Sequence, residues 1–159
     1  RLRHPKEVKK QMNVARESTQ EIVFETQRFG TLYITEEKII SFAQGIPGFK
    51  NLRRFILIDH DSEGLFKWLQ SIEDPLVAFL LTNPNVYKPE YSVPLRKNDI
   101  ETLDVKDMKN LVSLVMVCFA NGKVTLNLKG PVLFNSDNMR AIQCIIDRDD
   151  YQSHFVINV

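Results

Sequence analysis

The sequence has little that would cross-link a fold or cross a membrane. Its 159 residues include only 2 cysteines, Cys118 in the run LVMVCFA and Cys144 in IQCII. Neither has another cysteine or a histidine at metal-ligand spacing, so we interpret both as buried thiols in a reducing compartment. No stretch approaches the ~18 uninterrupted apolar residues of a membrane span, and no apolar segment follows the charged N-terminus. These absences favour a cytoplasmic protein that is neither exported nor inserted in a membrane.

The sequence also lacks the motifs of the common enzyme classes. None of G-x-x-x-x-G-K-[ST], G-x-G-x-x-G, G-x-S-x-G and H-E-x-x-H occurs. His60 lies between Asp59 and Asp61 and is expected in a solvated loop. Three pairs of adjacent carboxylates occur, at Glu36-Glu37, Glu73-Asp74 and Asp149-Asp150. Neighbouring residues of a strand point to opposite faces, so this spacing makes no acid–base pair. We therefore expect no enzyme activity, no cofactor and no metal.

A strong charge of one sign is missing overall, but the charges are unevenly distributed. The 21 basic and 20 acidic side chains give a net charge of +1. Residues 1–20 carry +4, which leaves −3 on residues 21–159. We expect a flexible basic tail over 1–20 and a mildly acidic folded domain over 21–159. An acidic domain is poorly suited to general binding of phosphate backbones, so we expect no direct nucleic-acid partner.

Short β-like stretches separated by turn residues follow from Glu21 onward. The clearest is a hairpin, in which 111–119 and 124–128 flank Asn121-Gly122, a pair that tolerates the positive φ angles of a type I′ turn. One short helix is predicted around 100–103, capped by Asn98 or Asp99. About nine or ten short strands at this turn spacing are typical of a sandwich or barrel. The predicted fold is an all-β, antiparallel, partly open barrel-like single domain with one or two short helices.

A glycine-rich loop, Gly45-Ile46-Pro47-Gly48-Phe49, is the most informative local feature. Its two glycines and proline fix a turn that places Ile46 and Phe49 at its shoulders. These side chains either anchor the loop on the core or form part of an exposed apolar patch for a partner.

Two other functions fit a small barrel. Arg53-Arg54-Phe55 and Phe66-Lys67-Trp68 interleave cations with rings, as in oligonucleotide-binding barrels, although burial of the rings in a core explains them better and the negative charge of the domain disfavours such binding. A flavin-binding barrel oxidoreductase would need a phosphate-binding cluster of Arg with Ser or Thr, and the sequence shows none.

Several motifs in a fixed order give the chain a family resemblance. They are Arg28-Phe29-Gly30, Ile39-Ile40-Ser41-Phe42, Gly45-Ile46-Pro47-Gly48-Phe49, Phe66-Lys67-Trp68-Leu69-Gln70-Ser71, Ala78-Phe79, Asn83-Pro84, Tyr91, the run from Val124 to Pro131, Asn135 and Gln143. In this order the chain resembles the flagellar assembly factor FliW family over about residues 22–157. One departure is Ala43, where the family usually has proline.

The resemblance implies a small β-barrel without catalytic activity. FliW-like proteins bind flagellin in the cytoplasm and also bind the carbon storage regulator CsrA, an RNA-binding repressor of flagellin translation. The implied mechanism is a partner switch, in which export of flagellin frees the FliW-like protein to capture CsrA and lift repression. For this chain we expect Ile46 and Phe49 to contact an apolar partner segment. The acidic residues expected to face the basic partner are Glu73, Asp74, Asp147, Asp149 and Asp150.

Overall fold

The computed structural model describes residues 21–159, and the predicted basic tail, 1–20, lies outside the described residues. The strands are β1 (Glu21–Thr26), β2 (Gly30–Thr35), β3 (Ile40–Phe42), β4 (Arg54–Asp59), β5 (Phe66–Ser71), β6 (Ala78–Thr82), β7 (Leu111–Ala120), β8 (Lys123–Leu126), β9 (Val132–Asn135), β10 (Arg140–Gln143) and β11 (Phe155–Ile157). One α-helix, α2 (Lys97–Leu103), and three single-turn 3-10 helices, Glu36–Lys38, Pro84–Val86 and Met108–Asn110, complete the described part.

Seven of the strands form a closed barrel. They follow the order β7-β6-β5-β4-β3-β10-β9, and β9 pairs with the first half of β7 from Leu111↔Asn135 to Leu114↔Val132. Every pair is antiparallel except β3 with β10, where Ser41 lies opposite Arg140. The all-β barrel prediction is confirmed, and pairing of β9 with β7 closes a barrel that was expected to be partly open.

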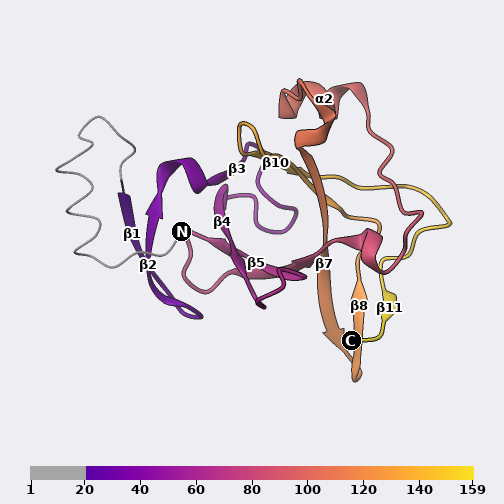
Figure 1. Cartoon of the computed structure of the whole chain (residues 1–159), viewed down its shortest axis with the longest axis horizontal. Coiled ribbons are helices and arrows are strands. Elements are labelled where there is room, and N and C mark those ends of the chain that lie inside the picture. Colours follow the sequence, from indigo (N-terminus) through magenta and orange to yellow (C-terminus); the bar gives the residue numbers. More distant parts are fainter. Residues whose placement is uncertain (1–20) are drawn as a thin grey trace.

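The second half of β7 leaves the barrel and forms a ribbon with β8 and β11 (Figure 1). The predicted hairpin is confirmed, with Asn121 at φ 54 and Gly122 at φ 73 in its turn. The prediction that Cys118 is buried is wrong: its side chain is exposed, and the neighbouring Phe119 is 68% exposed. An apolar run looked like a core strand, but its last residues extend past the barrel wall.

Alternation along the strands divides apolar side chains between the barrel interior and its outer layers. On β4, Phe55 is fully buried inside the barrel and meets Phe42 edge to face at 5.3 Å between ring centroids. The next residue, Ile56, faces outward and packs under the β1–β2 hairpin, against Leu32 and Ile34. The hairpin therefore covers the outer face of the barrel beside β4 (Figure 1).

The helix α2 covers a different part of the outer face. Its residue Leu103 is fully buried with Leu133 of β9 and with Cys144. The helix begins at Lys97, earlier than predicted, and the expected N-cap at Asn98 or Asp99 is wrong. Instead Asp99 lies in the first turn, where its carboxylate accepts a hydrogen bond from the Arg96 backbone N–H at 3.1 Å. The burial predicted for the Cys144 thiol is confirmed.

Candidate partner-binding surfaces

The two apolar side chains of the glycine-rich loop, Ile46 and Phe49, were both expected to contact a partner, but they differ in exposure. Ile46 is 1% exposed and belongs to the barrel core, whereas Phe49 is 41% exposed. The two residues form an isolated antiparallel bridge, in which the Phe49 N–H donates to Ile46 O at 2.6 Å. Partner contact by Ile46 is therefore corrected, because a side chain buried in the core anchors the loop and offers no surface.

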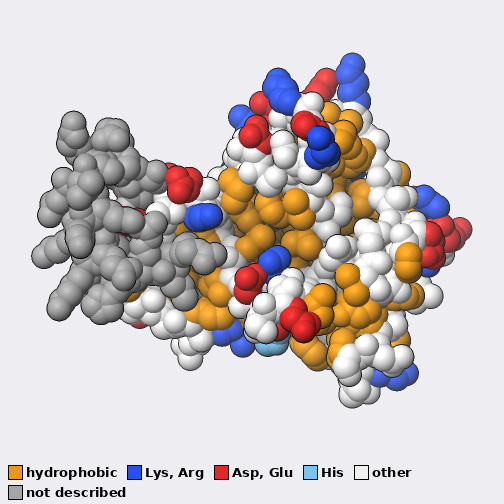
Figure 2. Space-filling model, in the orientation of Figure 1, with side chains coloured by type: hydrophobic (Ala, Val, Ile, Leu, Met, Phe, Trp, Pro, Cys, Tyr) orange, Lys and Arg blue, Asp and Glu red, His pale blue; other side chains and the backbone are white. Residues whose placement is uncertain are grey.

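Phe49 is held in place by the rings beneath it. Its ring meets Phe79 edge to face at 5.2 Å between centroids, and Phe79 in turn lies 6.3 Å from the ring of buried Phe55. Figure 2 shows hydrophobic side chains gathered in the middle of the face in view, between α2 and the strands β4 and β5. An exposed ring supported by a rigid core can contact an apolar partner without first being ordered.

The acidic segment 147–150 lies on the loop between β10 and β11. The Arg148 guanidinium binds the Asp150 carboxylate at two points, 3.0 and 2.6 Å, and lies 4.7 Å from the centre of the Tyr151 ring. These hydrogen bonds from Arg148 hold the pKa of Asp150 below its ordinary value. Asp147 and Asp149 are exposed, and neither has an ion pair with a residue in the described range 21–159. They are the carboxylates of this loop most available to a basic partner.

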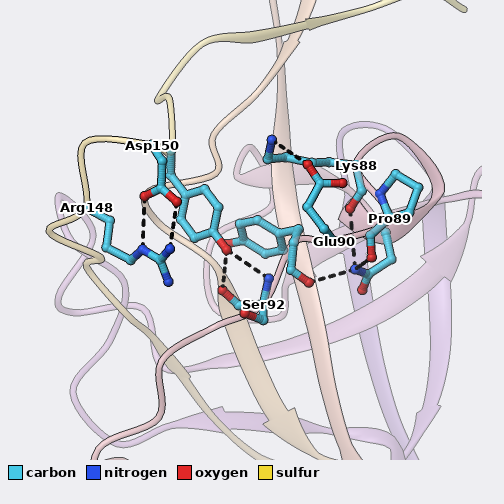
Figure 3. A network of polar contacts seen from close by, with 9 residues as sticks. Lys88, Pro89, Glu90, Ser92, Arg148 and Asp150 are labelled. Atoms are coloured by element: carbon cyan, nitrogen blue, oxygen red, sulfur yellow. Dashed lines mark hydrogen bonds and ion pairs between the residues drawn. The ribbon is translucent and has the colours of Figure 1, made fainter.

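A buried pair of tyrosines, Tyr91 and Tyr151, fixes the position of this loop. Figure 3 shows the surrounding polar contacts, with Ser92, Arg148 and Asp150 labelled. The Tyr151 hydroxyl accepts a hydrogen bond from the Ser92 N–H at 3.0 Å and donates one to Ser92 O at 2.9 Å. The rings of Tyr91 and Tyr151 lie 4.7 Å apart, and the Tyr91 hydroxyl donates to Leu128 O at 2.8 Å. Burial raises the pKa of Tyr91, so its hydroxyl remains a donor. The loop therefore presents its carboxylates from a fixed base.

The remaining nominated acids, Glu73 and Asp74, lie at the β5–β6 turn. The Glu73 carboxylate accepts hydrogen bonds from the backbone N–H groups of Arg53 at 2.6 Å and Arg54 at 3.1 Å. Asp74 accepts one from Leu76 N–H at 3.0 Å. Both carboxylates therefore stabilise the local fold.

The structure does not bring the nominated acids into one patch. The β5–β6 turn touches the β1–β2 hairpin, where Gln27 N–H donates to Pro75 O. In Figure 1 that hairpin lies on the left, and the yellow loop that includes 147–150 lies on the far right. A single acidic surface made of all five residues is therefore ruled out by their placement.

One cluster was not found by the sequence analysis. The Arg28 guanidinium lies 4.0 Å from the centre of the Trp68 ring, and Trp68 Nε1–H donates to His60 Nδ1 at 3.1 Å. His60 is in an exposed loop, as predicted. The three residues come from the β1–β2 turn, β5 and the β4–β5 loop, so no local pattern could reveal their proximity.

Residues 21–159 offer little that would support metal chemistry. They contain no group of three or more His, Cys, Asp or Glu side chains placed to hold a metal ion. Within the same range, no helix has both the length and the apolar character needed to cross a membrane.

Comparison with known protein families identifies the family to which this chain belongs. Residues 23–157 match the family described as FliW protein. The chain belongs to the FliW family. Among curated FliW relatives, the flagellar assembly factor FliW of Caldanaerobacter subterraneus subsp. tengcongensis is 39% identical over 129 residues, which covers 79% of this chain and 86% of the relative. The flagellar assembly factor FliW of Alkaliphilus metalliredigens is 35% identical over 140 residues, 86% of each chain.

A solved FliW structure has the same fold. The crystal structure of the flagellar assembly factor FliW superimposes with a TM-score of 0.77 at 29% sequence identity, covering 87% of this chain and all of that chain. The FliW relatives are named assembly factors, a role that is not enzymatic.

Proposed function

We propose that the protein is a non-enzymatic flagellar assembly factor that acts in the cytoplasm and binds flagellin and the translational repressor CsrA in turn. Flagellin would occupy the protein until export removes it, and the freed protein would then capture CsrA and relieve repression of flagellin translation. The observation that carries the proposal is membership of the FliW family over residues 23–157, with relatives named flagellar assembly factors.

The acidic loop supports the CsrA half of the proposal. An RNA-binding repressor presents basic residues, and complementary charge raises the encounter rate and penalises wrong partners. Asp147 and Asp149 are exposed on a loop that the Tyr151–Ser92 hydrogen bonds hold in place. We assign CsrA to this loop, with Asp149 as its central contact.

Phe49 supports the flagellin half. The terminal segments of flagellin are amphipathic and remain disordered until assembly, so they fold on a partner by placing an apolar face against it. Phe49 offers an exposed ring on a rigid support formed by Phe79 and Phe55. We assign the flagellin contact to the face around Phe49. Because this face and the acidic loop are separate, antagonism between the two partners would be transmitted through the barrel or through the bulk of the bound partners.

A competition assay tests the partner switch. Purified protein is immobilised and incubated with flagellin and CsrA, first separately and then together at equal concentration. The proposal expects capture of each partner alone, loss of bound CsrA as flagellin is added, and no capture of a flagellin-leader RNA. Failure to capture either partner alone would refute the proposal, and capture of the RNA in the absence of CsrA would instead support the oligonucleotide-binding alternative.

A further inference from the structure

Two arginines flank a serine on the outer wall of the barrel. In the strand register, Arg140 of β10 lies opposite Ser41 of β3, and Ser41 lies opposite Arg54 of β4. All three side chains are exposed, because their neighbours Phe42, Phe55 and Ala141 turn inward to the core. Two strand spacings separate the arginine backbones by about 10 Å, so both guanidinium groups can reach a group held above the serine.

This row forms the floor of a cleft beside α2. A cavity of about 340 Å³ is lined by the row, by Arg53 and by Thr102 of the helix. A second cavity of about 450 Å³, which includes Lys50, adjoins it and shares Arg53 and Ala43 with it. The two cavities together make an extended cleft with cations at both ends, on the face where β3, β4 and β10 lie next to one another below α2 (Figure 1).

The positive charge of this cleft is only partly neutralised. Arg54 Nε lies 3.7 Å from the Glu73 carboxylate, which also accepts two backbone hydrogen bonds. Arg53 donates from Nη1 to the Ala43 carbonyl oxygen at 2.8 Å, which fixes its guanidinium without cancelling its charge. Within residues 21–159, Arg140 and Lys50 form no ion pair with a carboxylate. The cleft is therefore a cationic site on a domain whose net charge is negative.

We propose that this cleft, which we name the Arg140 cleft, binds a carboxylate-rich segment of a partner protein. Guanidinium groups bind carboxylates through two parallel hydrogen bonds, and the Ser41 and Thr102 hydroxyls add donors between the charges. The Arg140–Ser41–Arg54 row contains neither Phe49 nor the acidic loop, whereas the adjoining cavity is lined by Gly45, Pro47 and Lys50 of the glycine-rich loop that also carries Phe49.

The shape of the cleft favours a peptide over a phosphate compound. The sequence showed no cluster of Arg with Ser or Thr. The fold assembles one from Arg54, Arg140, Ser41 and Thr102, so the expectation that the chain lacks such a cluster is corrected. A mononucleotide phosphate is usually held by backbone N–H groups of a glycine-rich turn. Here the turn at Gly45 is filled by its own loop, since a Cβ placed on Gly45 would lie 2.5 Å from Lys50 O. Cations spread along an open cleft instead match carboxylates spaced along an extended chain.

Fluorescence anisotropy with the full chain tests the proposal. The probe is a fluorescein-labelled peptide of alternating Glu and Ala, and its matched control has Gln in place of Glu. We expect the Glu peptide to bind, the Gln peptide not to bind, and the affinity to fall as sodium chloride is raised, because exposed charges are screened by salt. Absence of binding by the Glu peptide, or equal binding of the two peptides, would overturn the proposal.

Substitution of Arg140 locates the binding. Its side chain makes no hydrogen bond or ion pair with residues 21–159, so Arg140→Glu should leave the fold intact, and an unchanged melting curve verifies this. We expect Arg140→Glu to weaken peptide binding by about ten-fold and Arg140→Lys by about three-fold or less. Lys123→Glu, at the exposed end of the β7–β8 hairpin, is the matched control and should bind as the wild type does. Equal affinity of Arg140→Glu and wild type would place the peptide elsewhere and refute the Arg140 cleft.

Competitors separate the remaining ligand classes. Inorganic phosphate, flavin mononucleotide and a uridine-rich RNA oligonucleotide are each added to the preformed peptide complex. The proposal expects displacement only at concentrations far above that of the peptide. Displacement by any one of them at concentrations below that of the peptide would overturn the peptide assignment in favour of that ligand.

Discussion

Tyr151 and Ser92 lie 59 residues apart in the sequence and exchange two hydrogen bonds through one hydroxyl, at 3.0 and 2.9 Å. The Tyr151→Phe substitution removes that hydroxyl and leaves the Ser92 backbone groups without this partner. We expect the free energy of unfolding to fall by about 1–3 kcal/mol, measured by urea denaturation. The matched control is Tyr33→Phe, at a half-buried residue on β2, which should change stability by about 0.5 kcal/mol or less. Equal effects would contradict the structural role of the pair.

Gly45 and Gly48 both have positive φ, at 69° and 88°, but only Gly45 is sterically enclosed. A Cβ at Gly45 would lie 2.5 Å from Lys50 O and 2.7 Å from Lys50 Cα, whereas a Cβ at Gly48 meets nothing within 4 Å. Gly48→Ala should therefore cost only about 1 kcal/mol of backbone strain. Gly45→Ala should cost at least about 2 kcal/mol more, because backbone atoms must move. Thermal denaturation of both variants measures the difference, and equal melting temperatures would refute it.

The two thiols should differ sharply in reactivity. Cys118 is exposed, whereas Cys144 is buried, and its burial raises the pKa of the Cys144 thiol to about 11. The thiolate is the reactive form, so at pH 8 a disulfide reagent should label one thiol in the native protein and both in denaturant. Cys118→Ser should abolish native labelling, and Cys144→Ser should leave it unchanged. Rapid native labelling of Cys118→Ser would show that Cys144 is accessible.

Phe49→Ala should weaken flagellin binding by about ten-fold, or about 1.4 kcal/mol, since we assign Phe49 as an aromatic anchor, and anchors are the minority of interface residues whose truncation costs more than about 1 kcal/mol. CsrA binding should remain unchanged, because the acidic loop lies elsewhere. Leu76→Ala is the matched control, as Leu76 is 73% exposed at the β5–β6 turn. Isothermal titration calorimetry with each partner gives both affinities. Normal flagellin binding by Phe49→Ala would remove Phe49 from the proposed surface.

Asp149→Lys should weaken CsrA binding, with a larger loss at low salt than at high salt, and should leave flagellin binding largely intact. Asp149 is a cleaner choice than Asp150, whose carboxylate is held by Arg148. Glu63→Lys, at an exposed position between β4 and β5, makes the same change of charge and serves as the control. Equal loss of both partners from Asp149→Lys would indicate a shared surface or misfolding, which a melting curve distinguishes.

Local signals in the sequence predicted the fold more reliably than they predicted which residues meet on the partner-binding surfaces. Asn121-Gly122 specifies its own turn through backbone conformation, so the β7–β8 hairpin was predictable. The prediction that Cys118 is buried was wrong because an apolar run does not show where a strand leaves the barrel wall. The Arg140–Ser41–Arg54 row could not be predicted, since it depends on the parallel pairing of β3 with β10, a strand that lies far from β3 and β4 in the sequence. Glu73 illustrates the same limit, because its backbone donors lie about 20 residues before it.

Pairing of β9 with β7 has a consequence for the behaviour of the protein at high concentration. Unpaired strand edges recruit other chains and start aggregation. Because the ring of strands is complete, the free edges in residues 21–159 belong to the β1–β2 hairpin and to the ribbon that ends in β11, a strand of only three residues. The described part of the chain thus offers other copies of itself few strand edges on which stacking into fibres could begin.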